Sequence, residues 1–195
     1  MSKTLMALFA AAGLCLAGAS TAQTTTPHDK AARDQAIKAA DSQYKADKDA
    51  CKSLSGNAKD ICMQEAKGKE KVAKADAKAQ YDATPKAREN ARLARAEATY
   101  DVAKEKCDDM SGNQKDVCVK EAKAQYTKAK ADAKVDRVAA DTSQNAVKKT
   151  AEAKKDAAED KRDADYKVAV EKCDALAGNA KDACVRDAKA KFGKS

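Results

Sequence analysis

Residues 41–67 read DSQYKADKDACKSLSGNAKDICMQEAK, and close copies follow at residues 97–123 (EATYDVAKEKCDDMSGNQKDVCVKEAK) and 163–189 (DADYKVAVEKCDALAGNAKDACVRDAK). In each copy a tyrosine stands seven residues before the first cysteine, and a Gly-Asn pair lies between the two cysteines. The first two copies also share AKADAK, at residues 73–78 and 129–134. Self-similarity of this kind identifies a repeated structural unit.

Before its first cysteine each copy carries apolar residues at spacings of three, four and seven, which is the pattern of one helix face in a coiled-coil-like hairpin. The tyrosine belongs to this stripe, so we expect a core residue whose hydroxyl reaches outward. The residues expected on the buried face are Ile37, Ala40, Tyr44, Cys51 and Leu54 in the first copy, Leu93, Ala96, Tyr100, Ala103, Cys107 and Met110 in the second, and Tyr166, Ala169, Cys173 and Leu176 in the third.

A Gly-Asn pair follows the end of each stripe, and an aspartate lies three residues after the asparagine. Glycine just past a helix end commonly takes the left-handed conformation that stops the helix. Asparagine is a preferred N-cap, and an acid in the first turn suits the helix dipole, so a second helix is expected at once. Such a chain folds back as an antiparallel helical hairpin. The pairs are Gly56-Asn57, Gly112-Asn113 and Gly178-Asn179.

Both cysteines of a copy would then lie about one turn from the bend, on facing helices. A disulfide needs α-carbons within about 7 Å, which packed helices reach only near their connection. We therefore predict the disulfides Cys51–Cys62, Cys107–Cys118 and Cys173–Cys184. Catalytic oxidoreductases use Cys-x-x-Cys, whereas the spacing here is ten residues, so we expect structural staples.

The N-terminus has the pattern of a cleaved secretory signal peptide, residues 1–22. Lys3 precedes an apolar run at residues 5–17, and small residues follow at 17–19 and 20–22 as possible cleavage sites. The run is shorter than the roughly 20 residues of a spanning helix, so we expect a periplasmic chain with no membrane span after cleavage. Leu14 before Cys15 argues against lipid attachment at that cysteine. Six cysteines would remain, an even number typical of exported disulfide frameworks.

The composition favours helices that carry little apolar side-chain area to bury. After cleavage at Ala22, 173 residues would carry 38 basic and 31 acidic side chains, with no tryptophan and Phe192 as the one phenylalanine. Most of the apolar content is alanine, which forms stable helices but buries little area. The sequence therefore predicts an all-α, elongated and thin-cored fold of three antiparallel helical hairpins, each with a disulfide near its turn.

The expected hairpins are residues 23–84, 85–142 and 143–195, the last with a short second helix. Two segments resemble helix starts, with a cap followed by proline at the first helical position: Thr26-Pro27-His28-Asp29 and Thr84-Pro85.

The connection between the second and third bends is less regular. No proline or glycine occurs between Gly112 and Gly178, and the period between equivalent cysteines rises from 56 to 66 residues. Either one long helix runs through residues 114–176 or a turn lies at residues 141–145, which read DTSQN. We favour the turn.

The residues give no support to catalysis, a cofactor or a metal site. Carboxylates alternate with lysines along the expected helices, which is the pattern of a solvated surface. Each bend glycine is single, unlike a phosphate-binding loop, and His28 is the one histidine, so zinc ligands are lacking. We expect a protein that is not an enzyme.

Arg88, Arg92 and Arg95 fall on one helix face away from the apolar stripe. They are the candidate contact for an anionic envelope polymer such as lipopolysaccharide, although an ordinary solvated helix surface would look the same. Nucleic-acid binders usually interleave stacking aromatics with basic residues, whereas the tyrosines here lie in the stripe, so we expect no specific nucleic acid.

With its GNAKDxC and AKADAK blocks, the chain resembles a group of uncharacterised secreted Ala/Lys-rich proteins of Gram-negative bacteria that carry Tyr-x6-Cys-x10-Cys repeats. They are sometimes labelled TolA-like or cell envelope biogenesis proteins. The likeness covers most of residues 30–192 and implies a periplasmic setting without a particular activity. TolA itself keeps a membrane anchor and ends in a compact domain; this sequence shows neither, so no binding residues are transferred.

These observations favour a non-enzymatic structural or protein-interaction protein of the cell envelope. Its expected partner is another envelope protein or a second copy of itself. The alternative is a stress-linked periplasmic binder of client proteins or envelope polyanions.

Overall fold

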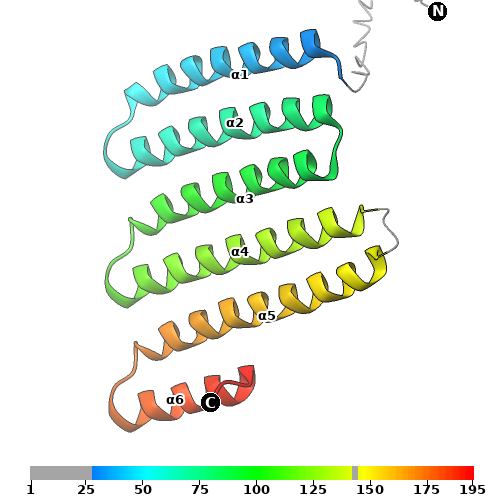
Figure 1. Cartoon of the computed structure of the whole chain (residues 1–195). Helices are drawn as coiled ribbons and strands as arrows, with labels where there is room; N and C mark the ends of the chain where they lie inside the picture. Colours follow the sequence, from blue (N-terminus) through cyan, green and yellow to red (C-terminus); the bar gives the residue numbers. More distant parts are fainter. Residues whose placement is uncertain (1–27, 142–144) are drawn as a thin grey trace, which may run out of the picture.

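The computed structural model describes residues 28–141 and 145–195, which form six α-helices arranged in a single layer (Figure 1). Consecutive helices run antiparallel, and each described helix packs only against those before and after it in the chain. The predicted all-α fold of three hairpins is therefore confirmed. In chain order the elements are α1 (Lys30–Ala50), the 3-10 turn η1 (Cys51–Ser53), α2 (Gly56–Asp82), α3 (Pro85–Cys107), α4 (Gly112–Ala139), α5 (Ala146–Cys173) and α6 (Gly178–Phe192).

The stretch between the second and third bends contains two helices, as favoured from the sequence. α4 ends at Ala139 and α5 begins at Ala146, so the chain turns between them. The longer period is absorbed by this connection and by α5, which has 28 residues against 23 in α3. α6 has only 15 residues and covers about half the length of α5 (Figure 1).

Two helices begin with side-chain caps. The Thr84 hydroxyl accepts a hydrogen bond from the Ala87 amide at 3.1 Å, and Pro85 occupies the first helical position, as expected. At α1 the cap is Asp29, whose carboxylate accepts from the Ala32 amide at 2.9 Å. The sequence placed Asp29 in the first turn of this helix, so that expectation was wrong by about one turn. Thr26, which was expected to be the cap, lies outside the described residues, as does Pro27.

The bends differ in detail from the expected glycine stop. Gly56, Gly112 and Gly178 do have positive φ angles, of +55°, +54° and +55°. Each one, however, begins the outgoing helix instead of ending the incoming one, and the residue before it is extended and serves as the cap. The asparagines are consequently not N-caps. They lie in the first turn, where their side chains are free to reach another helix.

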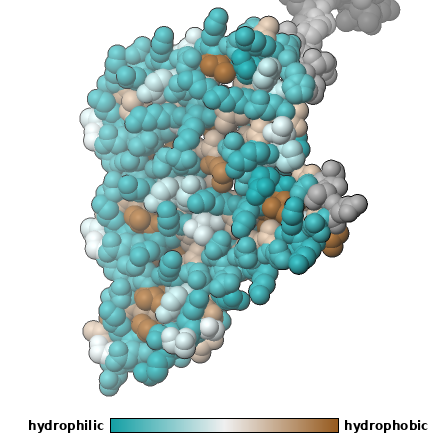
Figure 2. Space-filling view, in the orientation of Figure 1, coloured by the Kyte–Doolittle hydropathy of each residue, from teal (hydrophilic) through white to brown (hydrophobic). Residues whose placement is uncertain are grey.

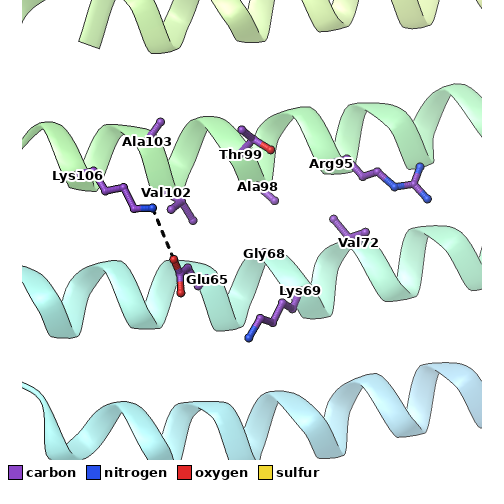
Figure 3. A pocket seen from close by; sticks show the side chains of 10 residues that line it. All are labelled: Glu65, Gly68, Lys69, Val72, Arg95, Ala98, Thr99, Val102, Ala103 and Lys106. Carbon is purple, nitrogen blue, oxygen red and sulfur yellow. Dashed lines mark ion pairs between the residues drawn. The ribbon is translucent and has the colours of Figure 1, made fainter. Parts of the chain in front are cut away.

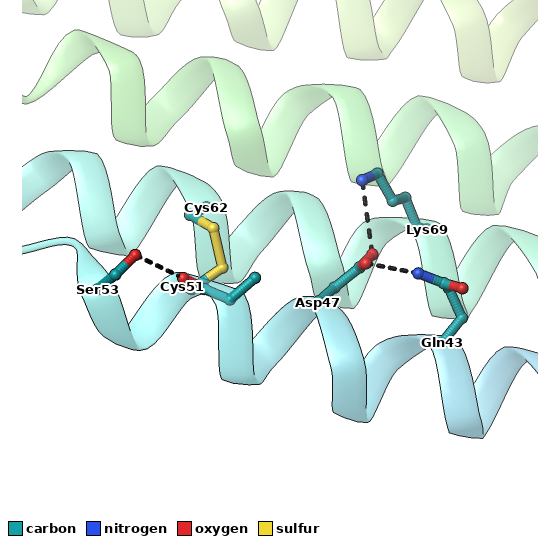
Figure 4. The surroundings of a disulfide bond; sticks show 7 residues. Gln43, Asp47, Cys51, Ser53, Cys62 and Lys69 are labelled. Carbon is teal, nitrogen blue, oxygen red and sulfur yellow. Dashed lines mark hydrogen bonds and ion pairs between the residues drawn. A yellow bond between two sulfur atoms is a disulfide. The ribbon is translucent and has the colours of Figure 1, made fainter.

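The three predicted disulfides are confirmed. Each joins the end of one helix to the first turns of the next, with α-carbons 5.7 Å apart. The first cysteine of each pair is fully buried, so the sulfur atoms also fill the space beside the bend. Figure 4 shows the Cys51–Cys62 bridge, with the Lys69–Asp47 contact (3.5 Å) joining the same two helices farther along.

The core is made almost entirely of alanine. Among the described residues, every buried hydrophobic side chain belongs to alanine or cysteine. Leu54, Met110 and Leu176 were expected in the core, but they are 42%, 46% and 44% exposed because each lies in the bend, past the end of the packed helices. The remaining residues of the expected stripes are buried or half-buried. The face in Figure 2 is accordingly hydrophilic, with isolated hydrophobic spots.

The asparagine after each bend glycine joins successive hairpins. Asn57 Nδ2 in α2 donates to the Glu105 carbonyl at the end of α3, at 2.9 Å. Asn113 Nδ2 in α4 makes the same bond to the Glu171 carbonyl at the end of α5, at 3.0 Å. Each of these carbonyls also accepts a backbone N–H at its own helix end, from Asp108 at 3.0 Å and from Asp174 at 3.1 Å. A carbonyl has two lone pairs, so the asparagine bonds are additional and tie each hairpin to the helix end of its neighbour.

We predict that the third disulfide is needed to hold α6 in place. A twelve-residue loop closure contributes about 2–3 kcal/mol, and within residues 28–141 and 145–195 α6 packs on α5 alone. Replacing Cys173 and Cys184 by serine should therefore speed amide hydrogen exchange throughout α6 by about tenfold or more, with α2 and α3 unchanged.

The matched control replaces Cys107 and Cys118 by serine, between helices that are packed on both sides. This control should lower the thermal midpoint measured by circular dichroism, but it should not speed amide hydrogen exchange in one helix selectively. Equal protection of α6 with and without its disulfide would contradict the prediction.

We also predict that the inter-hairpin asparagines stabilise the fold unequally. Asn57→Ala and Asn113→Ala should each lower the free energy of unfolding in urea by about 1 kcal/mol, the usual value of a hydrogen bond. Asn179 has the same place in the repeat, but it is exposed and, within the described residues, α6 packs on α5 alone. Asn179→Ala should therefore cost less than about 0.5 kcal/mol. Three equal losses would show that the asparagines act only within their own bends.

Candidate functional site

An open groove lies along the seam between α2 and α3, where the first hairpin meets the second (Figure 3). Its floor consists of small and apolar side chains, with Val72 and Val102 half-buried. Glu65 and Lys106 face each other across one end at 3.9 Å, and Lys69 and Arg95 lie along the rim. The groove thus combines an apolar floor with charges of both signs.

Gly68 explains why the floor is open. A Cβ atom at this position would lie 2.9 Å from the Ala98 Cβ, closer than two carbons can approach. The backbone of α2 therefore comes close to α3 at this point, and the floor is formed there by Gly68 and the methyl group of Ala98. Val72 and Val102 lie on either side of this contact and complete the apolar floor.

The seam between α4 and α5 has the same architecture but different chemistry. Positions equivalent to Val72 and Thr99 are taken by Lys128 and Asp165, counted from the cysteines. These two form an ion pair at 2.5 Å. The second seam thus carries a charged pair where the first has valine and threonine.

The three arginines predicted as a polyanion contact line one depression adjoining this groove, together with Asp76 and Gln80. Each already has a polar partner. Arg95 pairs with Asp76 at 2.6 Å, Arg92 pairs with Asp136 of α4, and Arg88 Nη1 donates to the Ala83 carbonyl at 2.9 Å. The structure places the arginines together, and their binding of a polyanion stays a prediction.

Glu89 is the buried acid of this region, at 8% exposure. Its Oε2 accepts from Lys86 Nζ at 2.6 Å and lies 3.0 Å from Arg137 Nε in α4. Burial alone raises the pKa of Glu89, but the hydrogen bond from Lys86 and the charge of Arg137 outweigh it, so the pKa lies below its ordinary value. Glu89 therefore links α3 to α4 as a carboxylate.

The repeat tyrosines are half-buried. Tyr100 stacks on Tyr126 with ring centroids 5.4 Å apart, and Tyr166 meets the edge of Phe192 at 6.2 Å. Sequence reasoning missed both partners. Tyr126 and Phe192 each stand eight residues after the second cysteine of their copy, and this shared aromatic position could have indicated a partner for the tyrosine. In the first copy the position is taken by Glu70.

The described residues contain no group of three histidine, cysteine or acidic side chains placed to hold a metal ion. His28 packs against Tyr81, with ring centroids 6.0 Å apart. Across residues 28–141 and 145–195, no helix is long and apolar enough to cross a membrane.

Comparison with known proteins identifies no relative. No protein-family model, no curated protein and no solved structure matches the chain. The resemblance to secreted Ala/Lys-rich repeat proteins therefore stays a prediction from the repeated motifs.

We predict that Glu89→Gln destabilises the fold at neutral pH but not in acid. Because the pKa of Glu89 is lowered by folding, its contribution is present above the ordinary glutamate pKa of about 4.3 and is lost as the pH falls below it. Urea unfolding should show a loss of about 1–2 kcal/mol at pH 7 that shrinks below about pH 4. Glu159→Gln, at an exposed position, should change little at any pH.

Proposed function

We propose that the protein is a non-enzymatic scaffold of the periplasm that binds another cell envelope protein in the groove between α2 and α3. The observation that carries the proposal is the apolar floor of this groove, which is rimmed by charged side chains of both signs (Figure 3). An exposed apolar surface rimmed by polar groups is typical of interaction sites.

The compartment follows in part from the bends. Three disulfides indicate an oxidising, extracytoplasmic location. The periplasm in particular is our proposal, supported by the signal-peptide pattern of residues 1–22, which lie outside the described residues.

The partner that the groove fits is an amphipathic helix. The floor runs along the seam between two antiparallel helices, so a third helix can lie along it with its apolar side facing Val72 and Val102. Polar side chains near the two ends of that helix would meet Glu65 and Lys106 at one end of the groove and Arg95 at the other (Figure 3). A partner of mixed charge is therefore favoured over an acidic or basic one.

A variant that keeps the fold can test the groove. Val72→Lys with Thr99→Asp transfers the ion pair of the second seam, which the repeat already accommodates, into the groove. We expect crosslinking from periplasmic extract, followed by mass spectrometry, to recover one stoichiometric envelope partner with the wild type and about tenfold less of it with the variant.

The reciprocal change, Lys128→Val with Asp165→Thr, is the matched control and should recover the partner as the wild type does. Equal recovery by the groove variant and the control would reject the groove as the binding surface.

The second candidate function is binding of an envelope polyanion, and the shared depression of Arg88, Arg92 and Arg95 favours it. Salt-sensitive retention on lipopolysaccharide that disappears when the three arginines become glutamine would support this alternative. Recovery of many unrelated clients would instead support a stress-linked binder.

A further inference from the structure

The two seams between hairpins repeat the same contacts, beginning with the Asn57 and Asn113 bonds described above. In the seam between α2 and α3, Lys106 pairs with Glu65, and Gln64 Nε2 donates to the Glu105 carboxylate. In the second, the equivalent pairs are Lys172–Glu121 at 2.6 Å and Lys120–Glu171 at 3.3 Å. One helix face, used by α2 and α4, therefore recognises a second face, used by α3 and α5.

α6 presents the first of these faces at the end of the stack. Asn179, Arg186 and Asp187 occupy the positions of Asn113, Lys120 and Glu121. All three are exposed, whereas Asn113 is half-buried under α5. Among the described residues α6 packs against α5 alone, so this face continues the repeat without a hairpin to cover it.

α1 presents the second face at the other end. Ser42, Ala46 and Asp49 stand where α5 has Ala164, Val168 and Glu171, and all three are exposed. The small residues allow another helix to approach as closely as at the internal seams. Asp49, which pairs with Lys52 of its own chain at 2.7 Å, supplies an acid at the position that pairs with Lys120 in the second seam.

We propose that the protein self-associates head to tail, with α1 of one copy packing on α6 of the next as a continuation of the internal seam. Arg186 would then pair with Asp49 of the neighbouring copy, and the Asn179 amide would donate to the Asp49 carbonyl. A contact between two different faces leaves one of each face free at the ends of a dimer, so further copies can add to form longer chains. Because α6 has 15 residues against 27 and 28 in α2 and α4, the contact between copies is shorter than the internal seams.

This self-association is separate from the proposed partner binding, because it uses the end helices and not the groove between α2 and α3. The groove variant, Val72→Lys with Thr99→Asp, should therefore associate as the wild type does. Failure of either proposal leaves the other standing.

The test is sedimentation velocity of the disulfide-bonded protein over a concentration series. The wild type should form dimers and longer chains as its concentration rises toward about 1 mM. Asp49→Arg and Arg186→Glu, each alone, place like charges across the contact and should raise the dissociation constant at least about tenfold.

Mixing the two variants provides the decisive control. The α6 end of the Arg186→Glu variant matches the α1 end of the Asp49→Arg variant, and their other two ends keep the wild-type pair of charges. The mixture should therefore regain the association that each variant alone has lost, in chains where the two variants alternate. Circular dichroism of each variant checks that the helices are intact. A wild type that stays monomeric, or a mixture that associates no better than the separate variants, would overturn the proposal.

Discussion

The disulfide at each bend is the interaction on which the other features depend, because the helices that it joins face each other with alanine side chains. Alanine removes little apolar area from water, so two such helices gain little from packing alone. Closing the bend covalently lowers the entropy of the unfolded chain instead. The buried sulfur of Cys51, Cys107 and Cys173 also supplies the bulk that alanine lacks at that end of each hairpin.

Fixed bends set the register of the whole layer. All three cysteine bends lie along one edge of the molecule, with the other connections along the opposite edge (Figure 1). This arrangement brings the asparagine of one bend to the helix end of the next hairpin, where Asn57 and Asn113 bond to backbone carbonyls. The groove between α2 and α3 results from the same register, because it places Gly68 opposite Ala98.

The sequence predicted what depends on local pattern and repetition: helices, bends, the three cysteine pairs and the turn before α5. It did not predict what depends on the packing of one hairpin on the next. Leu54 continues the apolar stripe in sequence, yet it projects beyond the end of the packed helices. The sequence around Asn57 is typical of a helix cap, whereas in the folded protein its side chain donates a hydrogen bond to the neighbouring hairpin. Comparing the copies shows that Lys128 stands at the position of Val72. Neither stretch shows that Val72 and Thr99 line one groove, or that Lys128 pairs with Asp165.

A single layer of helices with an alanine core also has a thermal consequence. The heat capacity increment of unfolding grows with the apolar surface that becomes exposed, and this increment sets the curvature of stability with temperature. Here each described helix is covered only by its chain neighbours, and the covered side chains are small. Unfolding therefore exposes little new apolar surface for the length of the chain. We therefore expect the stability of this protein to vary gently with temperature, and cooling to weaken it less than it weakens a globular protein built around leucine and phenylalanine.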